Sequence, residues 1–115
     1  MKVRTRQSLF ANMVAKLIQY VEEQGYELTL GEAWRPEWVA QEYARRRVGS
    51  PNSLHCERLA IDINLFKDGQ YLYKTEEYAW LGEWWKNLHP DNRWGGDISR
   101  MKDGNHFSNS YDKRI

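Results

Sequence analysis

One stretch of alternating apolar residues most constrains how this chain can fold. Between residues 59 and 66, every second side chain is a large aliphatic one: Leu59, Ile61, Ile63 and Leu65. Successive side chains of a strand point to opposite faces, so this alternation predicts a strand with one face on the core. Asp62 then projects from the less apolar face of what we expect to be a central strand.

Three other segments have signals of helices, and the first and third of them have the three- and four-residue apolar spacing of one helical face. The first covers residues 8–24, and Gly25 is a suitable stop. The second runs from Pro36 to about residue 47, because proline lacks the N–H that would be unpaired in a first helical turn. The third covers residues 75–88. Three helices are therefore expected.

The remaining segments carry the signals of strands and turns. Residues 26–33 alternate in polarity, and residues 67–70 have the composition of a hairpin turn before a return strand at 71–73. A short strand is expected at Trp94, and a last extended piece begins at His106. These signals predict a mostly antiparallel sheet.

The length limits how these elements combine. A chain of 115 residues is enough for one domain and leaves little room for a second. We therefore expect a single domain spanning residues 1–115. Its predicted fold class is α+β, with about three helices packed on a small, mostly antiparallel sheet.

The formal net charge of +1 argues against a dedicated nucleic-acid binder, which would carry a strong basic excess. The run Arg45, Arg46 and Arg47 is the local exception. One interpretation is a solvated helix end, where cations suit the helix dipole. The other is attraction toward an anionic polymer.

The sequence also bears on the compartment. A single cysteine, Cys56, excludes an internal disulfide and fits a reducing environment. No apolar stretch is long enough to span a membrane, so we expect no membrane insertion. The basic start is followed by a segment interrupted by Asn12, Lys16 and Gln19, which makes a poor signal peptide. We therefore expect a cytoplasmic protein without a signal peptide, which another factor must release if it acts outside.

Two histidines and one aspartate form a candidate metal site. His55 and Asp62 are seven residues apart, and an odd separation places them on opposite faces of one uninterrupted strand. The chain must therefore bend near residues 56–58 for both to reach one ion, and the fold must bring in His106. Two imidazoles and one carboxylate leave a fourth zinc position open, which is typical of catalytic zinc.

Two further residues have the chemistry to act beside such an ion. Asp103 stands three residues before His106, and its carboxylate could take a proton from an attacking water and pass it to a leaving amine. A turn role in Asp103-Gly104 is the alternative. Arg35 would supply a fixed cation for a developing oxyanion or a substrate carboxylate. Its alternative is a surface residue before proline.

At these positions the sequence resembles the M15 zinc peptidases, which include D-alanyl-D-alanine carboxypeptidases and phage endolysins. That family has Ser-x-His, a six-residue gap, Asp, and later an acidic residue three before a His. Here the pattern reads Ser53-x-His55, Asp62, then Asp103 and His106. A strand ending in an arginine, LTLGEAWR, and an aromatic-glycine segment, WGG, also match. The resemblance extends from about residue 28 to residue 107.

The resemblance implies a role for each matching residue. It implies His55, Asp62 and His106 as ligands of one Zn²⁺ per chain. Asp103 is implied as the catalytic base and Arg35 as the partner of the substrate carbonyl. Ser53 and Trp94 are implied as residues that orient the site or contact substrate. The sequence departs from the pattern at Arg58, where the family often has glycine.

The implied function is cleavage of peptides of the bacterial cell wall. Small members without a signal peptide resemble phage endolysins that cut between L-alanine and D-glutamate, and a holin would let such an enzyme reach the wall. A D,D- or L,D-carboxypeptidase remains an alternative, as does a non-catalytic wall-binding or structural phage module. We expect peptidoglycan as the partner, no nucleic acid, and a monomer.

Overall fold

The chain folds into helices and short strands, described for residues 2–50, 52–98 and 102–111 in a computed structural model. The α-helices of this part are α1 (Val3–Glu23), α2 (Glu37–Arg45) and α3 (Ala79–Leu88). Its strands are β1 (Glu27–Leu30), β2 (Ala60–Lys67), β3 (Gln70–Leu72), β4 (Asn92–Trp94) and β5 (His106–Asn109). Its short 3-10 helices are η1 (Leu54–Glu57), η2 (Thr75–Tyr78) and η3 (Gly95–Asp97).

β2 is the central strand of an antiparallel sheet with the order β1-β2-β5-β4, and β3 also pairs with β2. Leu65 pairs with both Leu28 of β1 and Leu72 of β3, so these two strands occupy opposite edges of β2. The expected central strand is therefore confirmed. The other half of β2 pairs with β5, which places Asp62 opposite His106.

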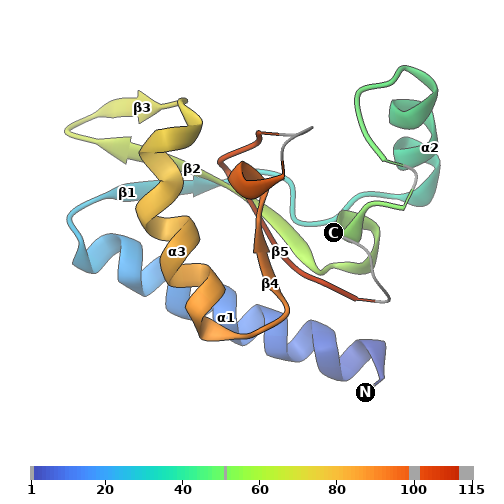
Figure 1. Cartoon of the computed structure of the whole chain (residues 1–115), viewed down its shortest axis with the longest axis horizontal. Helices are drawn as coiled ribbons and strands as arrows, with labels where there is room; N and C mark the ends of the chain where they lie inside the picture. Colours follow the sequence, from blue (N-terminus) through green and yellow to red (C-terminus); the bar gives the residue numbers. More distant parts are fainter. Residues whose placement is uncertain (1, 51, 99–101, 112–115) are drawn as a thin grey trace.

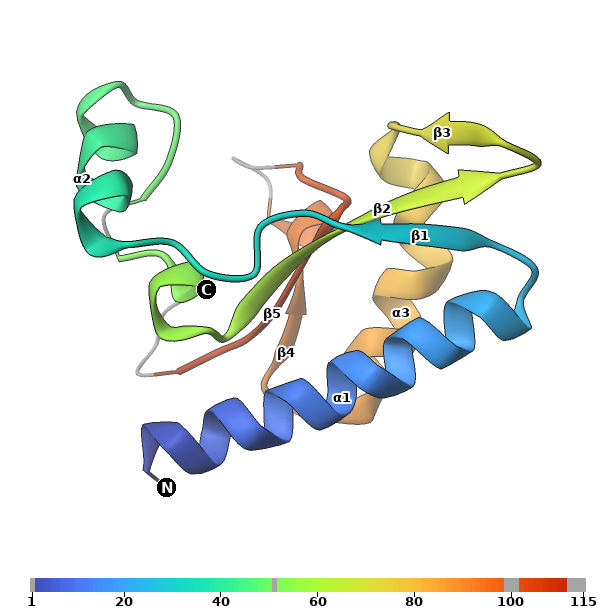
Figure 2. The ribbon, with the colours of Figure 1, turned by 180° about the vertical axis from the view of Figure 1, so that it is seen from behind.

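Helices α1 and α3 pack on one face of this sheet, and α2 stands apart at one end (Figures 1 and 2). The core lies between the sheet and the helices α1 and α3. It is built from fully buried side chains of α1, β2, α3 and β5, which include Leu17, Ile63, Trp85 and Phe107. The alternating residues of β2 enter this core, whereas Asp62 is only partly buried. The α+β fold expected from the sequence is confirmed.

The main departures from the sequence prediction lie at element ends. α1 begins at Val3 and not near residue 8, because Arg6 is held by groups distant in sequence. Its guanidinium donates to the Asn109 side chain at 2.7 Å and to Asp91 at 2.8 Å. These contacts stabilise a turn for which the local sequence has no strong signal. The predicted third helix divides into η2 and α3.

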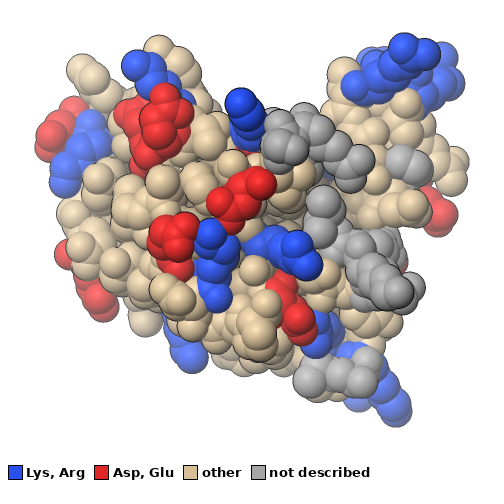
Figure 3. Space-filling view, viewed as in Figure 1, with Lys and Arg blue, Asp and Glu red and all other residues tan. Residues whose placement is uncertain are grey.

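Acidic and basic side chains are mixed over the face seen in Figure 3, as the near-neutral net charge suggests, except around α2. Figure 3 shows basic side chains gathered over the end of the molecule where α2 lies. Arg45 and Arg46 are exposed, and both pair with Glu42 at 2.5 and 3.0 Å, as expected of a solvated helix end. Within the described residues, no helix is long and apolar enough to cross a membrane.

Candidate metal centre

His55 is positioned by a short helical turn and not by a strand. The Ser53 hydroxyl caps η1 by accepting a hydrogen bond from the His55 backbone N–H at 3.2 Å. Arg58 ends η1 in the left-handed conformation, with φ of 56°, and directs the chain into β2. The bend that the sequence required near residues 56–58 is therefore present. It turns the buried His55 side chain toward the face of β2 that carries Asp62.

Asp62 and His106 face each other across the ladder of β2 and β5. Directly opposed residues in an antiparallel pair project to the same side of the sheet, so the register alone brings them together. On the other edge of β2, the backbone of Asp62 is hydrogen-bonded to the segment that follows β1. Gly31 donates to the Asp62 carbonyl at 2.7 Å, and the Asp62 N–H donates to the Glu32 carbonyl at 3.0 Å.

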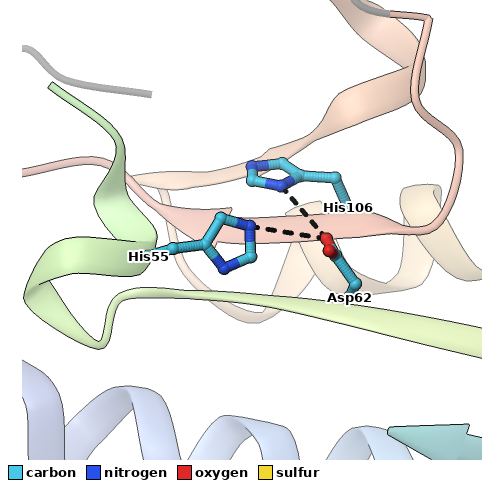
Figure 4. Close-up of side chains that lie close together, drawn as sticks. All are labelled: His55, Asp62 and His106. Atoms are coloured by element: carbon cyan, nitrogen blue, oxygen red, sulfur yellow. Dashed lines mark ion pairs between the residues drawn. The ribbon is translucent and has the colours of Figure 1, made fainter. Parts of the chain in front are cut away.

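The two imidazoles converge on the Asp62 carboxylate (Figure 4). His55 Nε2 and His106 Nδ1 each lie 3.5 Å from Asp62 Oδ1. One ligand atom from each residue lies within 4.8 Å of the other two. His55 and His106 are almost fully buried, and the Asp62 side chain is 23% exposed. The sequence prediction that these residues meet is confirmed, and their role as ligands stays a prediction.

The two ligand distances that involve Asp62 suit a zinc ion. Zinc bonds of about 2.0–2.2 Å to imidazole nitrogen and carboxylate oxygen separate two ligands of a tetrahedron by about 3.3 Å. The observed 3.5 Å is close to that edge and long for a hydrogen bond. Among the described residues, Asp62 Oδ1 is buried without a hydrogen bond, which is costly unless a cation occupies the space between the ligands.

The electrostatic environment keeps Asp62 ionised. Burial alone would raise the pKa of its carboxyl group, but the His106 and His55 side chains outweigh this effect and lower the pKa from 3.8 to about 2. Metal ligands must be deprotonated to bind. Asp62 is therefore in the form that a cation requires throughout the ordinary pH range.

Asp103 lies on the turn that leads into the second histidine ligand. The His106 N–H donates to the Asp103 carbonyl at 3.1 Å, and the Asp103 N–H donates to the Gly95 carbonyl at 3.2 Å. Asp103 is one of the residues that line a cleft of about 190 Å³, together with residues of β3 and η2. Burial raises the pKa of Asp103, Asp62 raises it further, and His106 and His55 oppose this rise in part.

The turn that carries Asp103 and His106 rests on the aromatic-glycine segment. The Trp94 indole N–H donates to the Gly104 carbonyl at 2.7 Å, and Trp94 is only 6% exposed. A Cβ at Gly95 would overlap the Asp103 carbonyl oxygen and approach His106 Cβ to 2.8 Å. Trp94 thus lies where it supports the turn. Glycine is needed at 95 for the turn to sit this close.

Arg35 is held close to the site by an acidic residue that the sequence prediction missed. Arg35 Nη2 pairs with Glu32 Oε1 at 2.5 Å, and the same oxygen lies 3.5 Å from His55 Nδ1. The Arg35 guanidinium also lies over the Tyr43 ring, 4.9 Å from its centre. The expected role of Arg35 toward substrate stays a prediction. Only the Glu-x-x-Arg spacing in GEAWR could have pointed to Glu32.

Comparison with known proteins supports the fold. No family model matches the chain, and no curated protein matches its sequence. Among solved structures, it is similar to the crystal structure of Serratia marcescens L-Ala D-Glu endopeptidase ChiX. The TM-score is 0.69 at 20% sequence identity, over 87% of this chain and 79% of that chain. The chain therefore shares the fold of an L-Ala D-Glu endopeptidase and carries a His-Asp-His group that could hold a metal ion.

Proposed function

We propose that this protein is a zinc-dependent peptidase that cleaves the stem peptides of bacterial peptidoglycan between L-alanine and D-glutamate. The observation that carries the proposal is the convergence of His55, Asp62 and His106 at a spacing suited to zinc. The structural similarity to an L-Ala D-Glu endopeptidase supports the choice of the L-alanine–D-glutamate bond as the one cleaved. The resemblance to the M15 pattern supports zinc-dependent hydrolysis.

Each residue of the site has a distinct task in this proposal. His55, Asp62 and His106 would hold the ion, which when bound acts as a Lewis acid toward a carbonyl and makes water more acidic. Asp103 accepts a proton from the attacking water and returns it to the leaving amine. Burial raises the pKa of Asp103 above its ordinary value, which is the direction that makes a carboxylate a stronger base. Arg35 stabilises negative charge on the substrate carbonyl oxygen.

The biological setting is part of the same proposal. A phage endolysin made in the cytoplasm of the bacterial host would reach the wall through a holin. The support for this setting is the resemblance to small M15 members.

The decisive test is digestion of purified peptidoglycan with the zinc-loaded protein, followed by mass spectrometry of the fragments. The proposal expects new amino termini at D-glutamate. Release of single C-terminal D-amino acids would instead identify a carboxypeptidase. No release of fragments would favour a non-catalytic wall-binding module.

Asp103→Asn tests the assignment of the base. This variant should bind zinc as the wild type does but lose about 10²–10⁴-fold in hydrolysis rate, because only the proton carrier is removed. Asp68→Asn, in the exposed turn between β2 and β3, is the matched control and should retain full activity. Measuring metal content and cleavage on the same samples separates the two effects. Near-full activity of Asp103→Asn would contradict the assignment.

A further inference from the structure

The segment between β1 and α2 touches the backbone of two candidate ligands. Gly31 donates to the Asp62 carbonyl and the Glu32 carbonyl accepts from the Asp62 N–H, as described above, and the Arg35 N–H donates to the His55 carbonyl at 3.1 Å. A Cβ at Gly31 would approach Asp62 Cβ to 3.0 Å, so the two segments are in close contact. Residues 31–35 therefore form one wall of the metal centre.

The Glu32 side chain lies on this wall between a ligand and an arginine. Its Oε1 faces His55 Nδ1 at 3.5 Å and Arg35 Nη2 at 2.5 Å. The Glu32 side chain is 28% exposed, and its Oε1 atom is buried. His55 Nδ1 is also buried and makes no hydrogen bond with the described residues. Glu32 is thus the carboxylate that faces this nitrogen, at a distance slightly longer than an ordinary hydrogen bond.

We propose that Glu32 is a positioning residue that holds the His55 imidazole for metal binding. His55 presents Nε2 to the site, so the proton of its neutral form must reside on Nδ1. A carboxylate facing Nδ1–H favours that tautomer, fixes the plane of the ring and makes the opposite nitrogen a better electron donor. This inference rests on the metal site of the proposed function, and it does not depend on the substrate.

Arg35 has a second task in this arrangement, because its ion pair restrains Glu32 in the orientation that meets His55. The Arg35 guanidinium is itself restrained by the Tyr43 ring of α2. A chain of contacts thus leads from α2 through Arg35 and Glu32 to His55. Glu32 thus contacts both Arg35, which we propose acts on the substrate, and His55, which we propose binds the metal.

The test is zinc affinity, measured by competition with a chelator of known strength and without any substrate. Glu32→Gln keeps the size of the side chain and can still accept a hydrogen bond from Arg35, so the fold should be retained. We expect zinc to bind about 10–100-fold more weakly than in the wild type, as when other residues that support metal ligands are removed. Glu37→Gln, an exposed acidic residue in the first turn of α2, is the matched control.

A spectroscopic measurement separates positioning from a general loss of structure. Loading with Co²⁺ in place of zinc gives absorption bands that depend on the geometry of the ligands. Glu32→Gln should change these bands, and Glu37→Gln should show the wild-type spectrum. Thermal unfolding of the metal-free proteins shows whether the fold is intact, and Glu32→Ala provides a second substitution at the same position.

Wild-type zinc affinity and an unchanged Co²⁺ spectrum in both Glu32 variants would overturn the inference, as would equal weakening in Glu37→Gln. A wild-type protein that binds no zinc would overturn it together with the metal site. Weaker zinc binding in Glu32→Gln, in a protein that does not cleave peptidoglycan, would support the role of Glu32 and contradict only the proposed function.

Discussion

Asp62 is the residue on which both histidines of the site converge. Its Oδ1 atom lies 3.5 Å from a nitrogen of each imidazole and has no hydrogen-bond donor among the described residues. The nearby imidazoles hold the pKa of Asp62 at about 2 although burial opposes this. A carboxylate whose pKa is lowered by folding contributes stability above its unfolded pKa, and this stability is lost as the pH falls through the folded value.

Asp62 should therefore make the metal-free protein sensitive to acid. Between pH 5 and pH 2, we expect the difference in free energy of unfolding between the wild type and Asp62→Asn to shrink by about 2 kcal/mol. This follows from the lowering of the pKa from 3.8 to about 2. Urea unfolding in the presence of a chelator, at several pH values, measures it. A difference that is independent of pH would show that the native carboxylate has an ordinary pKa.

At the scale of elements, the junction between η1 and β2 decides whether His55 and Asp62 face the same space. Arg58 makes this junction in the left-handed region, which side chains with a Cβ occupy at a cost of about 1 kcal/mol. Its guanidinium lies over the Trp34 ring, 4.7 Å from the centre, and this contact offsets part of the cost. The glycine often found here in the M15 pattern would avoid the cost.

Two substitutions of Arg58 should separate the conformational cost from the aromatic contact. Both Arg58→Gly and Arg58→Ala lose the contact with Trp34, but only alanine retains the strain of a positive φ. We therefore expect Arg58→Gly to be more stable than Arg58→Ala by about 1 kcal/mol. Chemical denaturation of the two variants gives this difference. Equal stabilities would mean that the junction can relax out of the left-handed conformation.

At the scale of the whole molecule, the candidate site joins segments that are distant in sequence. Residues 31–35, η1, β2 and β5 each contribute to it, and none of them supplies more than one of the three candidate ligands. An ion that bridges η1, β2 and β5 would bind the folded chain far better than the unfolded one. Metal binding should then stabilise the whole domain by mass action.

Thermal unfolding should reveal this coupling. Free zinc at a thousand times its Kd adds about 4 kcal/mol of stability, which for a domain of this size raises the Tm by about 10 °C or more. His106→Ala should abolish the shift, because one of the ligands is lost. Magnesium, which prefers oxygen ligands, is the control and should have little effect. The same Tm with zinc and with a chelator would count against the metal site.

Local patterns predicted the α+β class, the central strand and most of the helices. The alternation along β2 and the apolar spacing along α1 each describe one element at a time, because the periods of 2 and 3.6 residues arise within a segment. Local signals were weaker at boundaries. The start of α1 depends on Arg6 meeting Asp91 and Asn109, which lie at the other end of the sequence.

The sequence by itself determined which side chains could bind a metal, because the residue types and their order match a known pattern. Only the tertiary structure decided that they meet. The register of β2 against β5 aligns Asp62 with His106, and the turn at Arg58 brings in His55. The place of Glu32 beside His55 was also beyond the sequence, because an acidic residue three before an arginine is common on surfaces. Contacts between remote segments depend on which strands pair and in which register. The periodicity of a single segment does not contain that information.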